Sequence, residues 1–196
     1  MKLLTPGRIV LAIFTTVYMV GAVIYFSARG NAEFLGYIGA VAVLLLTVAL
    51  TLKWTDLPDW LLWLLSFQML LHILGGGVQI NGDILYNYVV YPIENPADLT
   101  FLKFDQVVHM FGSVVAALLV YSFLKRKSDF MALGLFLLTV LAASGIGAMN
   151  EIIEFVAKIT IPDTDVGGYY NTAVDLVVNF VGASFGAALA LQFWKK

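Results

Sequence analysis

Six long apolar runs dominate the sequence and limit the folds that it can adopt. Each run approaches or exceeds the roughly 20 residues that a helix needs to cross a hydrocarbon core of about 30 Å. The sequence therefore predicts an all-α, polytopic membrane protein with six transmembrane helices. We expect these helices over residues 9–26, 34–52, 60–77, 101–124, 130–155 and 170–194.

Composition supports the same fold class. Hydrophobic residues make up 61% of the chain and charged residues only 12%, with a mean hydropathy of +0.90. A soluble domain carries roughly 25% charged residues, so this chain has too little polar surface to cover a water-facing globule. A lipid bilayer accepts apolar side chains on the outside of the protein and is the expected partner. From its length we expect one transmembrane domain over residues 1–196.

Two classes of function are excluded by residue content. The chain contains no cysteine, which removes disulfides, thiolate catalysis and cysteine-based metal sites. Basic residues form no tract large enough to predict nucleic-acid binding.

The first apolar run could be a signal peptide, since Lys2 and Arg8 precede it. It exceeds the roughly 7–15 residues of a signal core, and we interpret it as a retained helix.

Lysine and arginine placement predicts the orientation, because short cytoplasmic loops are enriched in these residues. With a cytoplasmic N-terminus, the outer side carries only Arg29, Lys103 and Lys158. The inner side then carries eight basic residues: Lys2, Arg8, Lys53, Lys125, Arg126, Lys127, Lys195 and Lys196. We therefore expect both termini in the cytoplasm of a cell whose plasma or inner membrane holds the protein.

A few ionisable and amide side chains lie inside the apolar runs. A charged group at the centre of a membrane helix costs about 2.5–3.5 kcal/mol on insertion scales, so several together need a common explanation. The ionisable members are His72, Asp105, His109, Glu151, Glu154 and Asp175, and the amides are Asn150 and Asn179.

The expected topology brings these groups to one depth, near the outer ends of the last four helices. Asp105 and His109 are four residues apart, and Glu151 and Glu154 are three apart, so each pair shares a helix face. Asp175 begins a similar pair with Asn179. We expect the faces to converge in the bundle as one polar cluster, with Asp105, His109, Glu151, Glu154 and Asp175 as its core.

Each residue also has a structural interpretation. Asp105 and Asp175 can stabilise the first turns of their helices through the helix dipole. The histidines can be ordinary hydrogen-bonded interior residues, and the glutamates can face water at the boundary. Asn179, Gly182, Ala183 and Gly186 can serve packing alone, because residues 182–186 form a GxxxG motif.

Two chemical interpretations of the cluster remain open. In the first, Asp105, His109, Glu151, Glu154, Asp175 and His72 bind a divalent metal, for which zinc, manganese or iron suits mixed nitrogen and oxygen ligands. Such a metal could activate water to hydrolyse a lipid or an envelope precursor. In the second, the cluster relays protons or ions in a small transporter. HxxxH and HExxH motifs, typical of metal sites, are both missing.

These residues carry a resemblance to YjdF-like and VanZ-like bacterial and archaeal membrane proteins. Asp105, His109 and Gly112 resemble their Asp-x-x-x-His helix, and Glu151 and Glu154 resemble the Glu-x-x-Glu element of the YjdF-like group. The closing segment is similar at Asp163, Thr164, Gly167, Asp175, Asn179, Gly182, Ala183 and Gly186. Gln106 replaces a lysine usual in VanZ-like proteins, Glu154 replaces a glutamine, and an arginine before the last helix is missing. The resemblance thus favours the YjdF-like side and implies the site and topology without a substrate.

The sequence therefore predicts a multi-pass membrane protein with an outward-facing carboxylate and histidine site, associated with the cell envelope. A metal-dependent intramembrane hydrolase is the second hypothesis, and a small proton- or ion-coupled transporter is the third. Whether the protein is an enzyme stays open at this stage.

Overall fold

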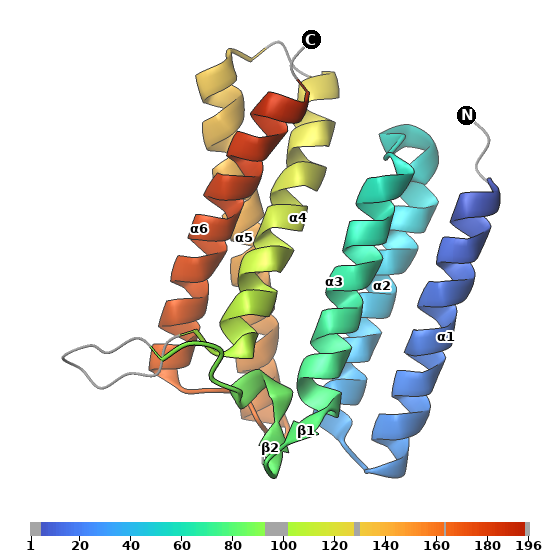
Figure 1. Cartoon of the computed structure of the whole chain (residues 1–196), viewed down its shortest axis with the longest axis vertical. Coiled ribbons are helices and arrows are strands. Elements are labelled where there is room, and N and C mark those ends of the chain that lie inside the picture. Colours follow the sequence, from blue (N-terminus) through green and yellow to red (C-terminus); the bar gives the residue numbers. More distant parts are fainter. Residues whose placement is uncertain (1–4, 93–101, 128–129, 163, 195–196) are drawn as a thin grey trace. The chain divides into compact units, whose positions relative to one another are not determined.

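The computed structural model describes residues 5–92, 102–127, 130–162 and 164–194. Lys2, Phe101, Asp163, Lys195 and Lys196, which the sequence predictions use, lie outside these ranges. Within them the chain forms six helices that are long and apolar enough to cross a membrane, which confirms the predicted fold class (Figure 1). They are α1 (Pro6–Ala28), α2 (Ala32–Thr55), α3 (Asp59–Gly77), α4 (Phe104–Lys127), α5 (Ala132–Thr160) and α6 (Tyr169–Phe193).

Local sequence signals set the helix ends. Thr5 accepts a hydrogen bond from the Arg8 N–H, and proline stands at the start of α1, where its missing N–H costs nothing. Asn31 caps α2 in the same way. Helix α5 continues five residues beyond the end that the apolar run predicted. Lys158 lies in its last turn, where the helix dipole favours a cation, so this charge does not end the helix.

The chain divides into two compact units, residues 1–85 and 86–196. In the first unit, hydroxyl groups link α1 to α3: Tyr18 donates to the Ser66 carbonyl at 2.9 Å, and Thr15 Oγ1 lies 2.7 Å from Ser66 Oγ. Phe26 and Phe34 stack with ring centroids 4.9 Å apart. A Cβ on Gly76 would lie 1.7 Å from the Phe34 ring, so the close packing there requires glycine.

A short hairpin follows α3 in the first unit, in the stretch between the expected helices over residues 60–77 and 101–124. Strands β1 (Gln79–Ile80) and β2 (Asp83–Ile84) pair antiparallel. Asn81 and Gly82, which join them, both have positive φ, at 55° and 87°. Positive φ at both central residues defines the tight turn that Asn-Gly favours, so this dipeptide was the sequence signal for the hairpin.

The second unit packs α4, α5 and α6 around small residues. A Cβ on Gly182 would lie 2.4 Å from the Met110 carbonyl oxygen, and one on Gly186 would lie 2.8 Å from that of Val114. Helices α4 and α6 therefore approach each other backbone to backbone, the contact that a GxxxG motif allows. The core of this unit consists of Ala116, Ala117, Val140, Ala143, Ala183 and Ala187.

The segment before α4 is tied to the start of that helix. The Val90 N–H donates to the Leu102 carbonyl at 2.9 Å, and the Phe104 N–H donates to the Tyr88 carbonyl at 2.8 Å. These bonds hold residues 88–90 against the start of α4. Phe104, which makes one of them, directly precedes Asp105.

Candidate functional site

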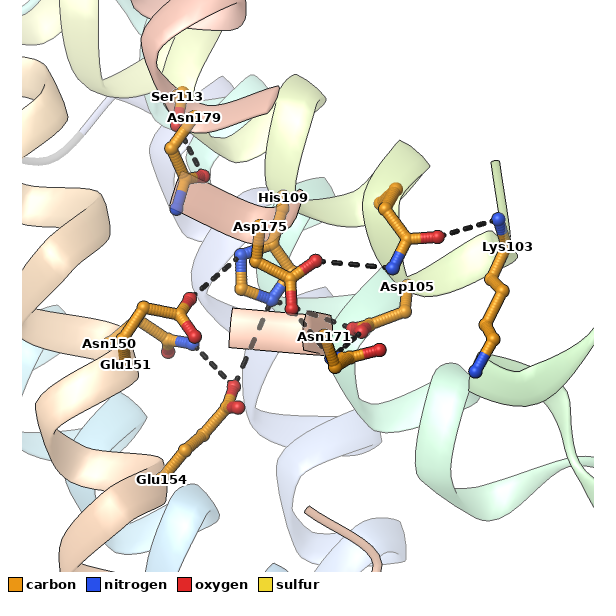
Figure 2. A network of polar contacts seen from close by, with 11 residues as sticks. Lys103, Asp105, His109, Ser113, Asn150, Glu151, Glu154, Asn171, Asp175 and Asn179 are labelled. Atoms are coloured by element: carbon orange, nitrogen blue, oxygen red, sulfur yellow. Dashed lines mark hydrogen bonds and ion pairs between the residues drawn. The ribbon is translucent and has the colours of Figure 1, made fainter. Parts of the chain in front are cut away.

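His109 on α4 is the centre of a polar cluster at one end of the second unit (Figure 2). Its Nδ1 lies 3.3 Å from Glu151 Oε1 on α5. Its Nε2 faces two carboxylates, with Asp105 Oδ1 at 3.5 Å and Glu154 Oε1 at 3.8 Å. His109 and Glu151 are buried, whereas the side chains of Asp105 and Glu154 remain 17% and 20% exposed. The cluster therefore reaches the surface of this unit on the side of Asp105 and Glu154.

Asp175 on α6 joins the cluster through amide side chains. Asn171 Nδ2 donates to Asp175 Oδ2 at 2.6 Å and to Asp105 Oδ2 at 3.1 Å, so one amide bridges carboxylates from two helices. Gln106 Nε2 donates to Asp175 Oδ1 at 3.2 Å. The Oε1 of Gln106 accepts the Lys103 N–H at 2.6 Å, which also caps the start of α4. Both oxygens of Asp175 are thus already bound by donors.

The glutamates of α5 accept fewer of the described hydrogen bonds than Asp175 does. Glu154 Oε1 accepts one hydrogen bond, from Asn150 Nδ2 at 2.7 Å. Neither oxygen of Glu151 accepts a hydrogen bond from the residues that the structure describes, although the residue is only 7% exposed. Apart from its contact with His109 Nδ1 at 3.3 Å, this buried carboxylate lacks described donors, which is expensive. Glu151 is therefore the member of the cluster with the strongest requirement for a further ligand.

Two groups of three side chains have the spacing that a metal ion needs. One is Asp105, His109 and Asp175, and the other is His109, Glu151 and Glu154, each with ligand atoms within 4.8 Å of one another. Ligand atoms around a tetrahedral metal at about 2.0–2.2 Å lie about 3.3–3.6 Å apart. The 3.5 Å between His109 Nε2 and Asp105 Oδ1 in the first group, and the 3.3 Å between His109 Nδ1 and Glu151 Oε1 in the second, match this spacing. Both exceed the roughly 2.7–2.9 Å of a charge-assisted hydrogen bond.

Hydrogen bonding distinguishes the two groups. In the first, the Asn171 amide already bridges Asp105 and Asp175 with its partly positive N–H groups. In the second, Glu151 accepts no hydrogen bond within the described ranges. The second group is therefore the better candidate metal site. Asp105 Oδ1 is then on the side where His109 Nε2–H can donate a hydrogen bond, as the second ring nitrogen of a metal-bound histidine commonly does to a carboxylate.

Charge also sets what the cluster can do. Asp105, Glu151, Glu154 and Asp175 provide four carboxyl groups around one imidazole. Carboxylates so close together in a poorly polarisable medium repel one another strongly, and they need protons or a metal cation as compensation. Chemically, the arrangement can hold a cation or exchange protons.

A family comparison covers nearly the whole chain. Residues 8–196 match the model of the family described as "Predicted membrane protein (DUF2238)". The chain belongs to this membrane protein family. Its helices and its apolar composition agree with that description. No match to the chain was found among the curated proteins or among the solved structures.

The structure brings together the five residues that we expected at the core of the cluster: Asp105, His109, Glu151, Glu154 and Asp175. His72 lies on α3 in the first unit, and its membership of the site stays a prediction. Asn179 lies one turn from Asp175 on α6 and accepts a hydrogen bond from Ser113 Oγ at 2.8 Å.

Sequence reasoning missed two amides that organise the cluster. Asn171 stands four residues before Asp175, the same spacing that joins Asp175 to Asn179, so extending that pattern by one turn would have found it. Gln106 was noticed only as a departure from a family pattern. Its location beside Asp105 gave no signal that its side chain would reach Asp175 on another helix.

Proposed function

We propose that this protein binds a divalent metal ion within the membrane, at His109, Glu151 and Glu154, and uses it to activate water. The observation that carries the proposal is a buried histidine of α4 whose Nδ1 lies 3.3 Å from Glu151 Oε1 of α5, in a group with Glu154 whose ligand atoms lie within 4.8 Å of one another. Glu151, which lacks hydrogen-bond donors among the described residues, supports it. Asp105 would orient His109 from the Nε2 side, and Asp175 would help to hold Asp105 through the Asn171 bridge.

The donor set favours particular metals and a reaction class. One imidazole among carboxylates is oxygen-rich, and such sites favour manganese or iron over zinc. A metal there can lower the pKa of a bound water and supply a nucleophile at neutral pH. We propose hydrolysis of a lipid or an envelope precursor as the reaction, on a site that opens toward the outer face of the cell membrane.

Further parts of this proposal rest on the sequence. The distribution of basic residues supports a cytoplasmic location for both termini at a plasma or inner membrane, and the outward direction of the site rests on that proposed orientation. The Asp-x-x-x-His and Glu-x-x-Glu patterns support a YjdF-like, VanZ-like grouping within the family. We also propose that the two units work as one transmembrane domain.

Metal analysis of the purified protein tests the central claim. We expect about one manganese or iron per chain in protein expressed with each metal supplied in turn. His109→Ala and Glu151→Gln should each remove the metal while the protein remains folded, as judged by helical circular dichroism. A His72→Ala variant decides whether that residue is a further ligand, since only loss of a ligand would lower the metal content. Wild-type protein without stoichiometric metal would overturn the proposal.

The reaction needs a separate measurement. Metal-loaded protein in vesicles of bacterial lipid extract should release water-soluble headgroups, detected by mass spectrometry, and His109→Ala should abolish the release. If the protein binds metal but releases no product from lipid or envelope-precursor substrates, the metal site stands and the hydrolase proposal is wrong.

A transport function is the second candidate, favoured by the chain of amide and carboxyl groups from Asp105 through Asn171 to Asp175. Linked groups of this kind can pass protons inside membranes. In proteoliposomes with an imposed pH gradient, Asp105→Asn and Glu154→Gln should each slow proton flux. Flux equal to that of wild type in both variants would exclude this function.

A further inference from the structure

Asn179 is held in one orientation next to the cluster. Ser113 Oγ donates to its Oδ1 at 2.8 Å, so the opposite side of the amide carries the Nδ2 donor. The residue is only 2% exposed, and Nδ2 donates to no acceptor within the part of the chain that the structure describes. In Figure 2 this nitrogen lies on the side toward His109 and Glu151, whereas the oxygen lies toward Ser113.

Gly147 on α5 provides the space that this amide occupies. A Cβ at Gly147 would lie 2.7 Å from Asn179 Cγ and 2.8 Å from Asn179 Nδ2. Glu151 follows Gly147 by four residues and shares its helix face. Side chains of a helix lean toward its N-terminus, so the Glu151 carboxylate is directed toward the turn where the Asn179 amide lies.

The two groups have complementary requirements. Asn179 Nδ2 is a donor that needs an acceptor, and Glu151 is an acceptor that needs donors. A metal ion cannot accept a hydrogen bond from an amide. A water molecule can accept from Asn179 and donate to Glu151 at the same time, and buried waters typically satisfy polar groups of this kind.

We propose that Asn179, Gly147 and Glu151 form a water-binding subsite at the buried end of the cluster, with Asn179 as the residue that positions the water. The inference rests on the proposed function in one respect: with a metal bound to Glu151, this water is next to the ion and is the one that the metal would activate. The hydrogen bonds to Asn179 and Glu151 themselves do not require the metal.

Nuclear magnetic resonance of the side-chain amides tests the subsite. The full chain would be labelled with ¹⁵N-asparagine, placed in nanodiscs and stripped of metal with a chelator. The Asn179 amide signal is identified by its loss in Asn179→Leu. We expect a rotating-frame cross-relaxation peak between this amide and a resident water in the wild type. Gly147→Ala should abolish that peak, because its Cβ displaces the amide.

Gly145→Ala is the matched control, since a Cβ at Gly145 meets nothing within 4 Å. This variant should keep the water peak. Absence of the peak in wild-type protein would overturn the inference, and so would an unchanged peak in a folded Gly147→Ala variant. Elemental analysis of the same preparation before chelation tests the metal separately. Metal without the water peak contradicts only the subsite, and the water peak without metal contradicts only the proposed function.

Discussion

The two units of the chain each contain three membrane-spanning helices, yet their polar side chains differ in charge and in pairing. In the first unit, Tyr18 and Thr15 bond to Ser66, so the polar groups of this contact are neutral. A charged pair of that unit, Arg8 and Asp59, matches one cation with one anion near the helix starts, and the Asp59 side chain is 45% exposed. In the second unit, four carboxyl groups gather around one imidazole.

The difference separates structural hydrogen bonding from a binding site. Neutral hydroxyl groups that join helices carry no charge that needs compensation, and in the first unit Tyr18, Thr15 and Ser66 are partners for one another. Buried carboxylates in excess of their donors stabilise nothing until a cation or protons arrive. Glu151 and Asp175 show the contrast inside the second unit, because amides bind both oxygens of Asp175 and neither oxygen of Glu151 accepts a described hydrogen bond.

The largest expected effect is stabilisation of the second unit by metal. Manganese at 100 times its Kd should stabilise the folded protein by about 2.7 kcal/mol, seen as a rise in the thermal unfolding midpoint in detergent. Glu151→Gln should lose this rise because it removes a ligand. Glu33→Gln, at a buried glutamate of α2 in the first unit, should keep it. Equal rises in wild type and Glu151→Gln would contradict the distinction between the units.

Substitution of a packing glycine in the second unit should change the stability by nearly as much as metal binding does. Gly182→Ala places a Cβ 2.4 Å from the Met110 carbonyl oxygen, which is backbone and moves only with its helix. We expect destabilisation by about 1–3 kcal/mol, measured as the shift of the thermal unfolding midpoint. Gly21→Ala on α1 meets nothing within 4 Å and should leave stability almost unchanged. A tolerated Gly182→Ala would show that α4 and α6 are less tightly packed.

Neutral polar groups should affect different properties in the two units. Asn171→Ala removes the bridge between Asp105 and Asp175 and should lower metal affinity about 10- to 100-fold, as loss of ligand-supporting contacts does. Ser66→Ala in the first unit should cost about 0.5–1.5 kcal/mol of stability and leave metal affinity unchanged. Isothermal titration calorimetry with manganese measures the metal affinity of both variants. An unaltered affinity in Asn171→Ala would make that amide purely structural.

The smallest effect is expected at the ion pair of the first unit. Asp59→Asn removes the partner that lies 2.7 Å from Arg8 Nε. Because Asp59 is partly exposed and screened by solvent, we expect a loss of about 0–1 kcal/mol. The loss should shrink further at high salt. Unfolding midpoints measured at low and high salt check both expectations, and a loss as large as that of Gly182→Ala would show that this pair stabilises the first unit more than its exposure suggests.

By itself, the sequence determined the fold class and most members of the cluster. Apolar runs of bilayer length specify membrane helices because lipid leaves the chain few other ways to satisfy its backbone. The spacing of Asp105 with His109, and of Glu151 with Glu154, determined which side chains share a face, since that depends only on helical periodicity. The Gly182 and Gly186 pattern likewise indicated a close helix contact.

Only the tertiary structure decided which partner each side chain meets. Periodicity gives the face of a helix but not its rotation and register against its neighbours, and these set the contacts between helices. The reach of Gln106 to Asp175, and the contact of Gly147 with the Asn179 amide, arise from that register. So does the difference between an Asp175 bound by amides and a Glu151 that lacks described donors, because a carboxylate's hydrogen bonds depend on side chains from other helices.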